Sequence, residues 1–357
     1  MRPFGQSFIP GPVDVHPEVL EATLQPYYFT FNEKMQGLLA SMQPALRAMF
    51  GTSQTIFLSA SAASGLMEAA VRSGVRNRVL AVVGGYFGEM FARIAEACGK
   101  EVIRAVVPPG HTLEPDLLAR FLEGPEVDAV TLVHSESSTG ALAPLPELAR
   151  VVRARNDTVL LVDAVTSIGA MPMEMDNWGI DFLLTGSQKA LALPPGMAMG
   201  AASPRLVARA ESLHDRGFFL SATHLLNAAR RNFPLTTPAL PVIHALHRQL
   251  QRIEASGGLP ARFARHQAMQ AMLAEWAESR TDLAILADRS HRSPTVTALE
   301  LRNGRPASEV VKALEARNWL VTTGLAPMVE KVIRIGHMGD LEPEHLRRLL
   351  QQLEAVL

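Results

Sequence analysis

The sequence has a single cysteine, Cys98, among its 357 residues. One cysteine cannot form an intrachain disulfide, and it is too few for a cysteine-rich zinc module. An excess of charge is also missing, because 34 Lys and Arg residues oppose 35 Asp and Glu residues and leave a formal net charge of −1. Such a chain lacks the overall positive field that attracts nucleic acids. We therefore expect neither a disulfide scaffold nor a nucleic-acid-binding protein.

Long apolar segments are missing as well. No uncharged apolar run is long enough to cross a bilayer, and the N-terminal residues MRPFGQSFIPGPVDV contain no apolar core of signal-peptide length. Hydrophobic residues make up 48% and charged residues 19% of the chain, as in ordinary globular proteins. We therefore expect a cytoplasmic globular enzyme without a membrane partner, and the length allows about two domains.

What the sequence does contain is an alternation of short apolar runs and amphipathic stretches. The runs are apolar throughout rather than at every second position, which is typical of parallel strands covered on both faces. Alternation of such strands with helical patterns favours a doubly wound α/β fold. The predicted strands of this first part are residues 55–60, 78–85, 102–107, 129–134, 158–163 and 182–186.

A change in pattern at Gly257 and Gly258 predicts a second domain. One long helical pattern ends before these glycines and another follows them. Strands are then expected over residues 295–301 and 331–339, with a final helix over 342–357. We therefore predict a large domain over residues 1–257 and a small α+β domain over residues 258–357.

Most of the strands of the first part end in polar or aromatic groups, at the edge where parallel sheets bind ligands. Strand 55–60 runs into SAASG and a helix, whose free N–H groups suit a phosphate. Strand 78–85 ends in GGYFGE, whose aromatic pair can stack on a flat ligand but is no dinucleotide fingerprint. Strand 129–134 ends in HSESSTG, a polar cluster that is costly to bury unless it is hydrogen-bonded. Each feature alone also fits a tight turn, a core aromatic or a helix cap.

Two ionisable residues follow neighbouring predicted strands. Asp163 leaves an apolar strand and needs a cation or several donors, whereas Lys189 precedes the apolar stretch ALALPPGMAMG, which favours a lowered pKa and a nucleophilic amine. Alone, either residue could be structural. Together with a phosphate cradle and a stacking aromatic they describe a pyridoxal 5′-phosphate site, where a lysine forms a Schiff base and an aspartate keeps the pyridine nitrogen protonated.

The motifs also occur in the order of a known family. The stretch VDAVTSIGAMPMEMDNWGIDFLLTGSQKALALPPGMA, residues 162–198, resembles the signature of the class V, fold type I pyridoxal-phosphate aminotransferases, with the alanine–glyoxylate and serine–pyruvate group the nearest. HSESSTG, GGYFG, IPGP near the N-terminus and VIRIGHMG near the C-terminus fit the same group. The resemblance covers essentially the whole chain. It implies a large domain built on a mostly parallel seven-stranded sheet and a small α+β domain.

The resemblance implies roles for residues around the cofactor. Lys189 matches the lysine that binds the cofactor and moves the substrate proton, and Asp163 matches the partner of the pyridine nitrogen. The other matches are Ala63 and Ser64 in the phosphate loop, assisted by Gln188, Val165 and Phe87 on the two ring faces, and Ser137 near the phenolic oxygen.

Three further matches concern the substrate and a second subunit. Arg334 matches the arginine that binds the substrate carboxylate, and Gly11 matches backbone that closes over the substrate. Thr237 matches a residue that reaches the phosphate of the neighbouring subunit, which implies a homodimer.

Some positions depart from the family pattern. Ala63 stands where many relatives have a glycine, and the aromatic segment 27–31 stands where many have a His-Arg pair. Phe233 and Pro234 occupy the region where many relatives place a tyrosine. In the family these positions lie near the cofactor or the active-site entrance, so the amino donor stays open.

The implied activity is a ping-pong transamination from a small amino acid, of the alanine or serine type, to glyoxylate or pyruvate. Other enzymes of the same fold are the alternatives: 2-aminoethylphosphonate, ureidoglycine or pyridoxamine transaminases, or an amino-acid lyase. A cysteine desulfurase is disfavoured, because Cys98 lies in a helical pattern typical of a buried residue. No metal is expected, because His244 and His247 lack an acidic third ligand at a suitable spacing.

Overall fold

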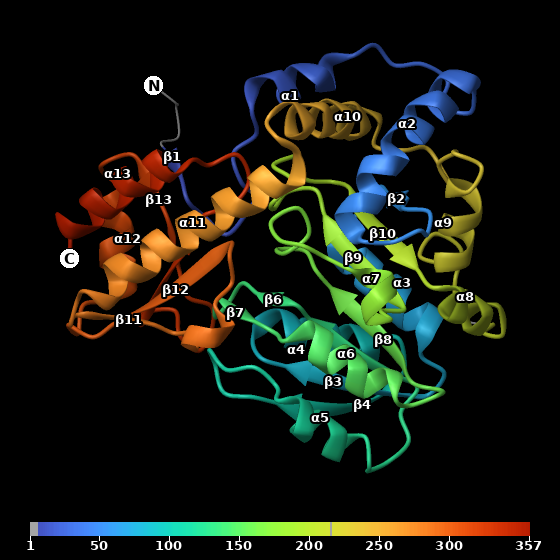
Figure 1. The fold of residues 1–357 in the computed structure, drawn as a ribbon, viewed down its shortest axis with the longest axis horizontal. Helices are drawn as coiled ribbons and strands as arrows, with labels where there is room; N and C mark the ends of the chain where they lie inside the picture. Colours follow the sequence, from blue (N-terminus) through green and yellow to red (C-terminus); the bar gives the residue numbers. More distant parts are fainter. Residues whose placement is uncertain (1–5, 215) are drawn as a thin grey trace.

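The computed structural model describes residues 6–214 and 216–357. Its largest element is a seven-stranded sheet with the strand order β2-β10-β9-β8-β5-β3-β4 (Figure 1). The strands are β2 (Phe57–Ser59), β3 (Arg78–Val83), β4 (Glu101–Val106), β5 (Ala129–Val133), β8 (Val159–Asp163), β9 (Phe182–Gly186) and β10 (Ala198–Ala202). The expected seven-stranded α/β sheet is confirmed.

Six of these strands are the predicted ones, and they run parallel to one another. The seventh, β10, was not predicted and is antiparallel to both of its neighbours, β9 and β2. Its sequence, AMGAA, is rich in alanine and glycine, which strands disfavour. Strand β10 is nevertheless buried throughout, because it lies inside the sheet.

Both faces of the sheet are covered by helices. In β8, Leu160 and Val162 pack in one core cluster while Val159 and Leu161 pack in another, as the two-residue period of a strand requires. The first cluster includes residues of α2 (Glu33–Phe50), α5 (Pro115–Phe121), α6 (Leu145–Arg153), α7 (Met175–Trp178) and α10 (Leu240–Ala255). The second includes residues of α3 (Ala63–Gly74), α4 (Tyr86–Ala97), α8 (Pro204–Glu211) and α9 (Ala222–Ala229).

A second sheet, of four antiparallel strands, is formed by the C-terminal part of the chain. Its order is β11 (Leu283–Ile285), β12 (Val296–Leu301), β15 (Val332–Gly336) and β14 (Thr322–Thr323). A third core cluster joins this sheet to α11 (Gly258–Glu278), α12 (Ala307–Glu315) and α13 (Pro343–Glu354). The sequence had indicated β12, β15 and the flanking helices, but the division at residue 257 stays a prediction.

The N-terminal segment joins this C-terminal part. Strand β1 (Gln6–Ser7) pairs in parallel with β13 (Trp319–Leu320), and the two lie near α13 in Figure 1. The chain then passes to α1 (Pro17–Glu21) and the short helix η1 (Ala22–Leu24), which contact α10. The smaller elements are β6 (Ser135–Glu136), β7 (Ala141–Leu142) and η2 (Arg289–His291). Within residues 6–214 and 216–357, no helix combines the length and the apolar character that a membrane span needs.

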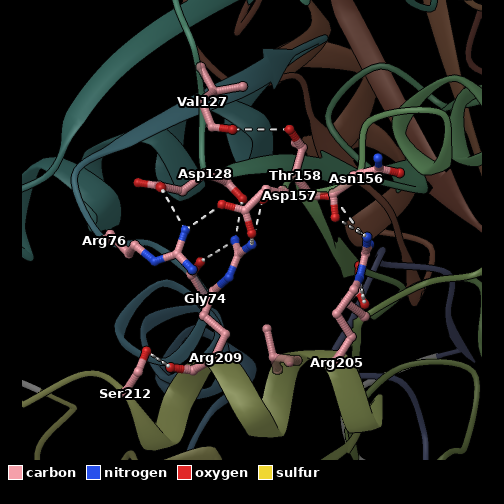
Figure 2. Close-up of polar contacts among 12 residues, drawn as sticks. Gly74, Arg76, Val127, Asp128, Asn156, Asp157, Thr158, Arg205, Arg209 and Ser212 are labelled. Carbon is pink, nitrogen blue, oxygen red and sulfur yellow. Dashed lines mark hydrogen bonds and ion pairs between the residues drawn. The ribbon is translucent and has the colours of Figure 1, made fainter.

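Two arginines of α8 bind the carbonyl groups at the amino ends of the parallel strands (Figure 2). Arg209 is buried and donates to the carbonyl oxygens of Gly74, Asp128 and Asp157, at 3.2 and 2.6 Å for the first two, while pairing with the Asp157 carboxylate. Arg205 pairs with the buried Asp181. These contacts hold α8 against the edge of the sheet opposite to the carboxyl ends.

Replacing Arg209 by alanine should lower the free energy of unfolding by about 3 kcal/mol, because three carbonyl groups and a carboxylate each lose one donor. Urea unfolding measures this loss. The exposed Arg155 serves as the control, since its replacement by alanine should change stability by less than about 0.5 kcal/mol. Ligand binding at the opposite edge should be unchanged in both variants, and equal stability of the two would contradict the role given to Arg209.

Candidate active site

A cavity of about 170 Å³ lies at the carboxyl edge of the large sheet. It is open to the ends of β5, β8 and β9 and to the first turns of α3 and α4. Eight residues singled out in the sequence line it together: Ala63, Ser64, Phe87, Ser137, Asp163, Val165, Gln188 and Lys189.

One end of the cavity is the N-terminus of α3. The residue before the helix is Ala62, and no side chain of the described residues caps the helix. Ala63 and Ser64 therefore present N–H groups of the first turn to the cavity, where the helix dipole favours an anion. Gln188 lies beside Ala63, since a Cβ atom on Gly186 would lie 2.6 Å from Gln188 Oε1 and 3.4 Å from the Ala63 Cβ atom. A phosphate group fits this end.

Asp163 ends β8 and is only 4% exposed. Its Oδ1 accepts a hydrogen bond from the Val165 N–H at 2.8 Å, and the carboxylate forms no ion pair within the described residues. Burial raises the pKa of Asp163 to about 7, against the lowering effects of the Val165 hydrogen bond and of the Lys189 charge. A protonated ring nitrogen beside the carboxylate would supply the missing cation. The residue thus fits a pyridine-containing cofactor.

Lys189 lies on the turn after β9 and is 9% exposed. Its Nζ donates to the Pro10 carbonyl oxygen and lies 5.9 Å from the centre of the Phe87 ring. Burial and, to a smaller extent, the charge of Arg334 lower the pKa of Lys189 to about 8, against the opposite effects of Asp163 and Glu136. A large share of the amine is therefore neutral near pH 8, as a nucleophile toward carbonyl groups must be.

Glu136, part of the HSESSTG cluster but not singled out in it, fixes the aromatic side of the cavity. Its carboxylate accepts hydrogen bonds from the backbone N–H groups of Phe87 and Gly88, at 3.0 and 3.1 Å, and from both donors of Ser138. Burial raises the pKa of Glu136, and these four hydrogen bonds oppose the rise. The carboxylate therefore anchors the first turn of α4 and with it Phe87, whereas Tyr86 is 49% exposed. A carboxylate directly after a buried strand was the available sequence signal.

Arg334 lies on β15 of the second sheet and is 8% exposed. Its Nε donates to the Thr323 carbonyl oxygen at 2.9 Å and its Nη1 to that of Ser137 at 3.2 Å. The guanidinium forms no ion pair, and Nη2 donates to no group, within the described residues. Burial lowers the pKa of Arg334, and the charge of Glu136 acts in the opposite direction. A buried arginine without a carboxylate partner is suited to bind a carboxylate substrate.

Gly11 lies against Lys189. Its φ of +103° is strained for any other residue, and a Cβ atom there would lie 2.6 Å from Lys189 Cδ. The N-terminal segment therefore covers the lysine with backbone alone, through Pro10 and Gly11.

Thr237 is the one expected cofactor residue that lies elsewhere. It lines another cavity, together with Phe219 and Phe233. Phe233 stacks on Phe31, with 6.3 Å between the ring centres, and Phe29 is 71% exposed beside it. Among the described residues, no group of three or more His, Cys, Asp or Glu side chains could hold a metal ion.

Known proteins with similar sequences and structures share this arrangement of the chain. A model of the aminotransferase class-V family matches residues 39–342. The chain is 31% identical to L-aspartate–glyoxylate aminotransferase of Paracoccus denitrificans, over 94% of this chain and 86% of that protein. Among solved structures, alanine–glyoxylate aminotransferase from Nostoc sp. is similar with a TM-score of 0.93 and 28% identity, over 100% of this chain and 96% of that one. Aspartate aminotransferase from Thermus thermophilus is similar with a TM-score of 0.90 and 31% identity, over 98% and 99% of the two chains.

The pKa of Asp163 makes a prediction for the cofactor-free protein. Burial moves this pKa from 3.8 to about 7, so between these values the folded state keeps a proton that the unfolded chain loses. Stability is therefore lost as the pH rises through this window, by up to about 4 kcal/mol. The Asp163→Asn variant cannot ionise and escapes this loss. Urea unfolding should give the two proteins similar stabilities at pH 4 and a more stable variant at pH 7.5; a difference independent of pH would contradict the assignment.

Proposed function

The chain belongs to the class-V aminotransferase family, and on that premise we propose that it moves an amino group from a small amino acid, of the alanine or serine type, to glyoxylate or pyruvate. The enzyme is a transaminase with pyridoxal 5′-phosphate as its cofactor. The observation that carries the proposal is the burial of Lys189, Asp163 and Arg334, with the charges of the other two acting on Lys189, and without an ion pair to any described residue. The cofactor ring nitrogen would supply the opposite charge for Asp163, and the carboxylates of the two substrates would supply it for Arg334.

We assign the cofactor to the cavity at the carboxyl edge of the large sheet. The N-terminus of α3, with Ser64 and Gln188 beside it, holds the phosphate, and Asp163 holds the ring nitrogen. Val165 and Phe87 line the same cavity and cover the ring. When bound, the protonated pyridine ring withdraws electrons from the substrate and lowers the cost of removing the proton from its Cα atom.

Lys189 moves that proton. Its Nζ, with a pKa near 8, accepts the proton from the substrate Cα atom. It then donates the proton to a second carbon atom, which is the one that gains a hydrogen in this half of the reaction. The Pro10 carbonyl oxygen orients Nζ by accepting its hydrogen bond. Because the residue is 9% exposed, little water competes for the proton. One side chain thus serves as base and then as acid.

Arg334 orients both substrates. The Thr323 carbonyl oxygen fixes Nε and the Ser137 carbonyl oxygen fixes Nη1. The guanidinium therefore has one orientation, in which Nη2 and the remaining hydrogen of Nη1 can donate to a substrate carboxylate. In a ping-pong reaction the amino acid and the 2-oxo acid bind in turn, and each carries a carboxylate at the same end. One arginine therefore serves both halves of the reaction.

The choice of substrates rests on similar enzymes. Proteins named L-aspartate–glyoxylate and alanine–glyoxylate aminotransferase match nearly the whole chain, and both names combine an amino acid with glyoxylate. We carry the pairing of a small amino acid with a 2-oxo acid over to this chain, since Arg334 accepts a carboxylate from either.

We also propose a homodimer that shares its sites. Thr237 lines a cavity apart from its own cofactor cavity, so the phosphate it is expected to reach is that of a partner subunit. The aromatic side chains of Tyr27, Phe29 and Phe31 are exposed, and Phe31 stacks on Phe233 of the Thr237 cavity, which gives such a contact an apolar surface. A cytoplasmic location is part of the same proposal, and the unpaired Cys98 supports it.

The first prediction concerns Lys189. The purified enzyme with its cofactor should be yellow, and alanine or serine should bleach the visible absorption and release the matching 2-oxo acid. The Lys189→Ala variant should lack this absorption band and turnover, because it has no amine to bind the cofactor. The exposed Lys312→Ala variant is the control and should behave as the wild type. A panel of amino donors against glyoxylate and pyruvate tests the substrate class, and bleaching by none of them would refute it.

The second prediction concerns Arg334. In the Arg334→Leu variant, KM for alanine and for pyruvate should rise by roughly 10- to 100-fold, since a charged hydrogen bond to the carboxylate is lost. The visible absorption should remain, because Arg334 does not line the cofactor cavity. Steady-state kinetics measure both KM values, and an unchanged KM would reject the carboxylate-binding role.

A further inference from the structure

The turn that carries Lys189 has a strained backbone. Ala192 has a φ of +52°, a left-handed conformation that costs an alanine about 1–2 kcal/mol. Its N–H donates to the Lys189 carbonyl oxygen at 2.8 Å, which closes the turn directly behind the lysine. A strained turn at a functional residue persists only where the surrounding structure holds it.

Two buried side chains hold this turn by its carbonyl groups. Arg262, on α11 and 5% exposed, donates from Nη2 to the Ala190 carbonyl oxygen. Gln249, on α10 and fully buried, donates to the Leu191 carbonyl oxygen at 2.9 Å. Ala190 and Leu191 are the two residues that follow Lys189, so both contacts act on the turn itself.

Asp340 connects the same two side chains to the strand of Arg334. It accepts from Arg262 Nη1 at 2.8 Å and from Gln249 Nε2 at 3.1 Å, and it lies in the segment between β15 and α13. Burial alone would raise the pKa of Asp340, but the Arg262 guanidinium and the hydrogen bonds hold it below its ordinary value. The carboxylate is therefore charged, and it pairs with Arg262 at neutral pH.

The network is poorly suited to stability alone. Among the residues that the structure describes, none forms a hydrogen bond with the buried Arg262 Nε or Gln249 Oε1. Each such group costs about 1–3 kcal/mol, and apolar residues of similar volume often replace buried ion pairs without loss of stability. What the network does provide is a direct connection between the turn of Lys189 and the segment that follows Arg334.

We propose that Arg262, Gln249 and Asp340 form a positioning unit that fixes Lys189 relative to Arg334. The unit joins α10 and α11 across the Gly257–Gly258 junction, so it sets how the carboxylate-binding strand sits against the lysine turn. For the reaction this means that the substrate Cα atom, placed through its carboxylate on Arg334, lies within reach of Lys189 Nζ. The inference rests on the proposed transaminase function for this last step only.

The test compares two arginines of α11. Arg265, three residues after Arg262, pairs with Glu342 at 2.9 Å and donates to the Gly339 carbonyl oxygen at 3.0 Å. It thus binds the segment around Asp340 as Arg262 does, but it does not contact the lysine turn. Each variant therefore loses one salt bridge and one contact to a carbonyl oxygen, but only Arg262→Gln loses the contacts to Asp340 and Ala190.

The first measurement is hydrogen exchange of residues 187–193, followed by mass spectrometry in the cofactor-free protein. The N–H groups of Ala192 and Leu193 are hydrogen-bonded within this segment, so a loosened turn exposes them. We expect exchange about tenfold faster in Arg262→Gln and unchanged in Arg265→Gln. Gln249→Met, which leaves the ion pair intact, should also speed exchange and serves if Arg262→Gln fails to fold.

The second measurement is the half-reaction of the holoenzyme with alanine, followed by the loss of visible absorption. A misplaced lysine should lower the maximal rate of Arg262→Gln by roughly 10- to 100-fold, with a change below about threefold in the half-saturating alanine concentration. Arg262→Lys keeps the charge toward Asp340 and should recover part of the rate.

Four outcomes decide the matter. Faster exchange together with a slower half-reaction in Arg262→Gln alone supports the positioning unit. Equal effects of Arg262→Gln and Arg265→Gln, or lower thermal stability with unchanged exchange, overturn it. If the wild type shows no visible absorption with the cofactor, the transaminase function is refuted. The hydrogen-exchange comparison still tests the positioning unit in that case, because it uses the cofactor-free protein.

Discussion

The burial of uncompensated charge at one edge of a parallel sheet is the constraint on which the rest of this structure depends. Lys189, Asp163 and Arg334 are all less than 10% exposed, and within the described residues none of them has an ion pair. Such groups are costly in the absence of ligands. The folded chain tolerates them because two extensive cores and a second sheet surround the cavity. The charge of Glu136 favours the charged forms of Lys189 and Arg334, although it disfavours the charged form of Asp163.

Arginine side chains are fully paired at one edge of the large sheet and incompletely paired at the other. At the amino edge, Arg209 and Arg205 are saturated by carbonyl groups and by carboxylates, which makes that edge a stabilising one. At the carboxyl edge, within the part of the chain that the structure describes, Arg334 keeps one nitrogen without an acceptor, and Lys189 Nζ donates to a backbone carbonyl oxygen and to no carboxylate. The same residue types therefore contribute stability where they are paired, and binding capacity where they are not.

The parts that the sequence predicts are those governed by local pattern and by the geometry of parallel sheets. Six strands were recognisable as apolar runs, and Asp163 and Lys189 could be brought together because carboxyl ends of neighbouring strands share an edge. Strand β10 was not predicted, because its small residues do not indicate a strand. Arg334 followed from a family resemblance, since its partner Ser137 is far away in sequence. Arg262 and Gln249 were unremarkable positions in helical patterns, because a long-range contact leaves no local periodicity.

The pairing of β1 with β13 has a consequence for the order of folding. The segment that carries Pro10 and Gly11 onto Lys189 starts from a strand whose neighbour, Trp319–Leu320, is far away in the sequence. Because such a long-range pairing has a high loop-closure cost, we expect β1 to join its partner late in folding. A partly folded chain in which only the large sheet has formed would therefore leave the reactive amine uncovered.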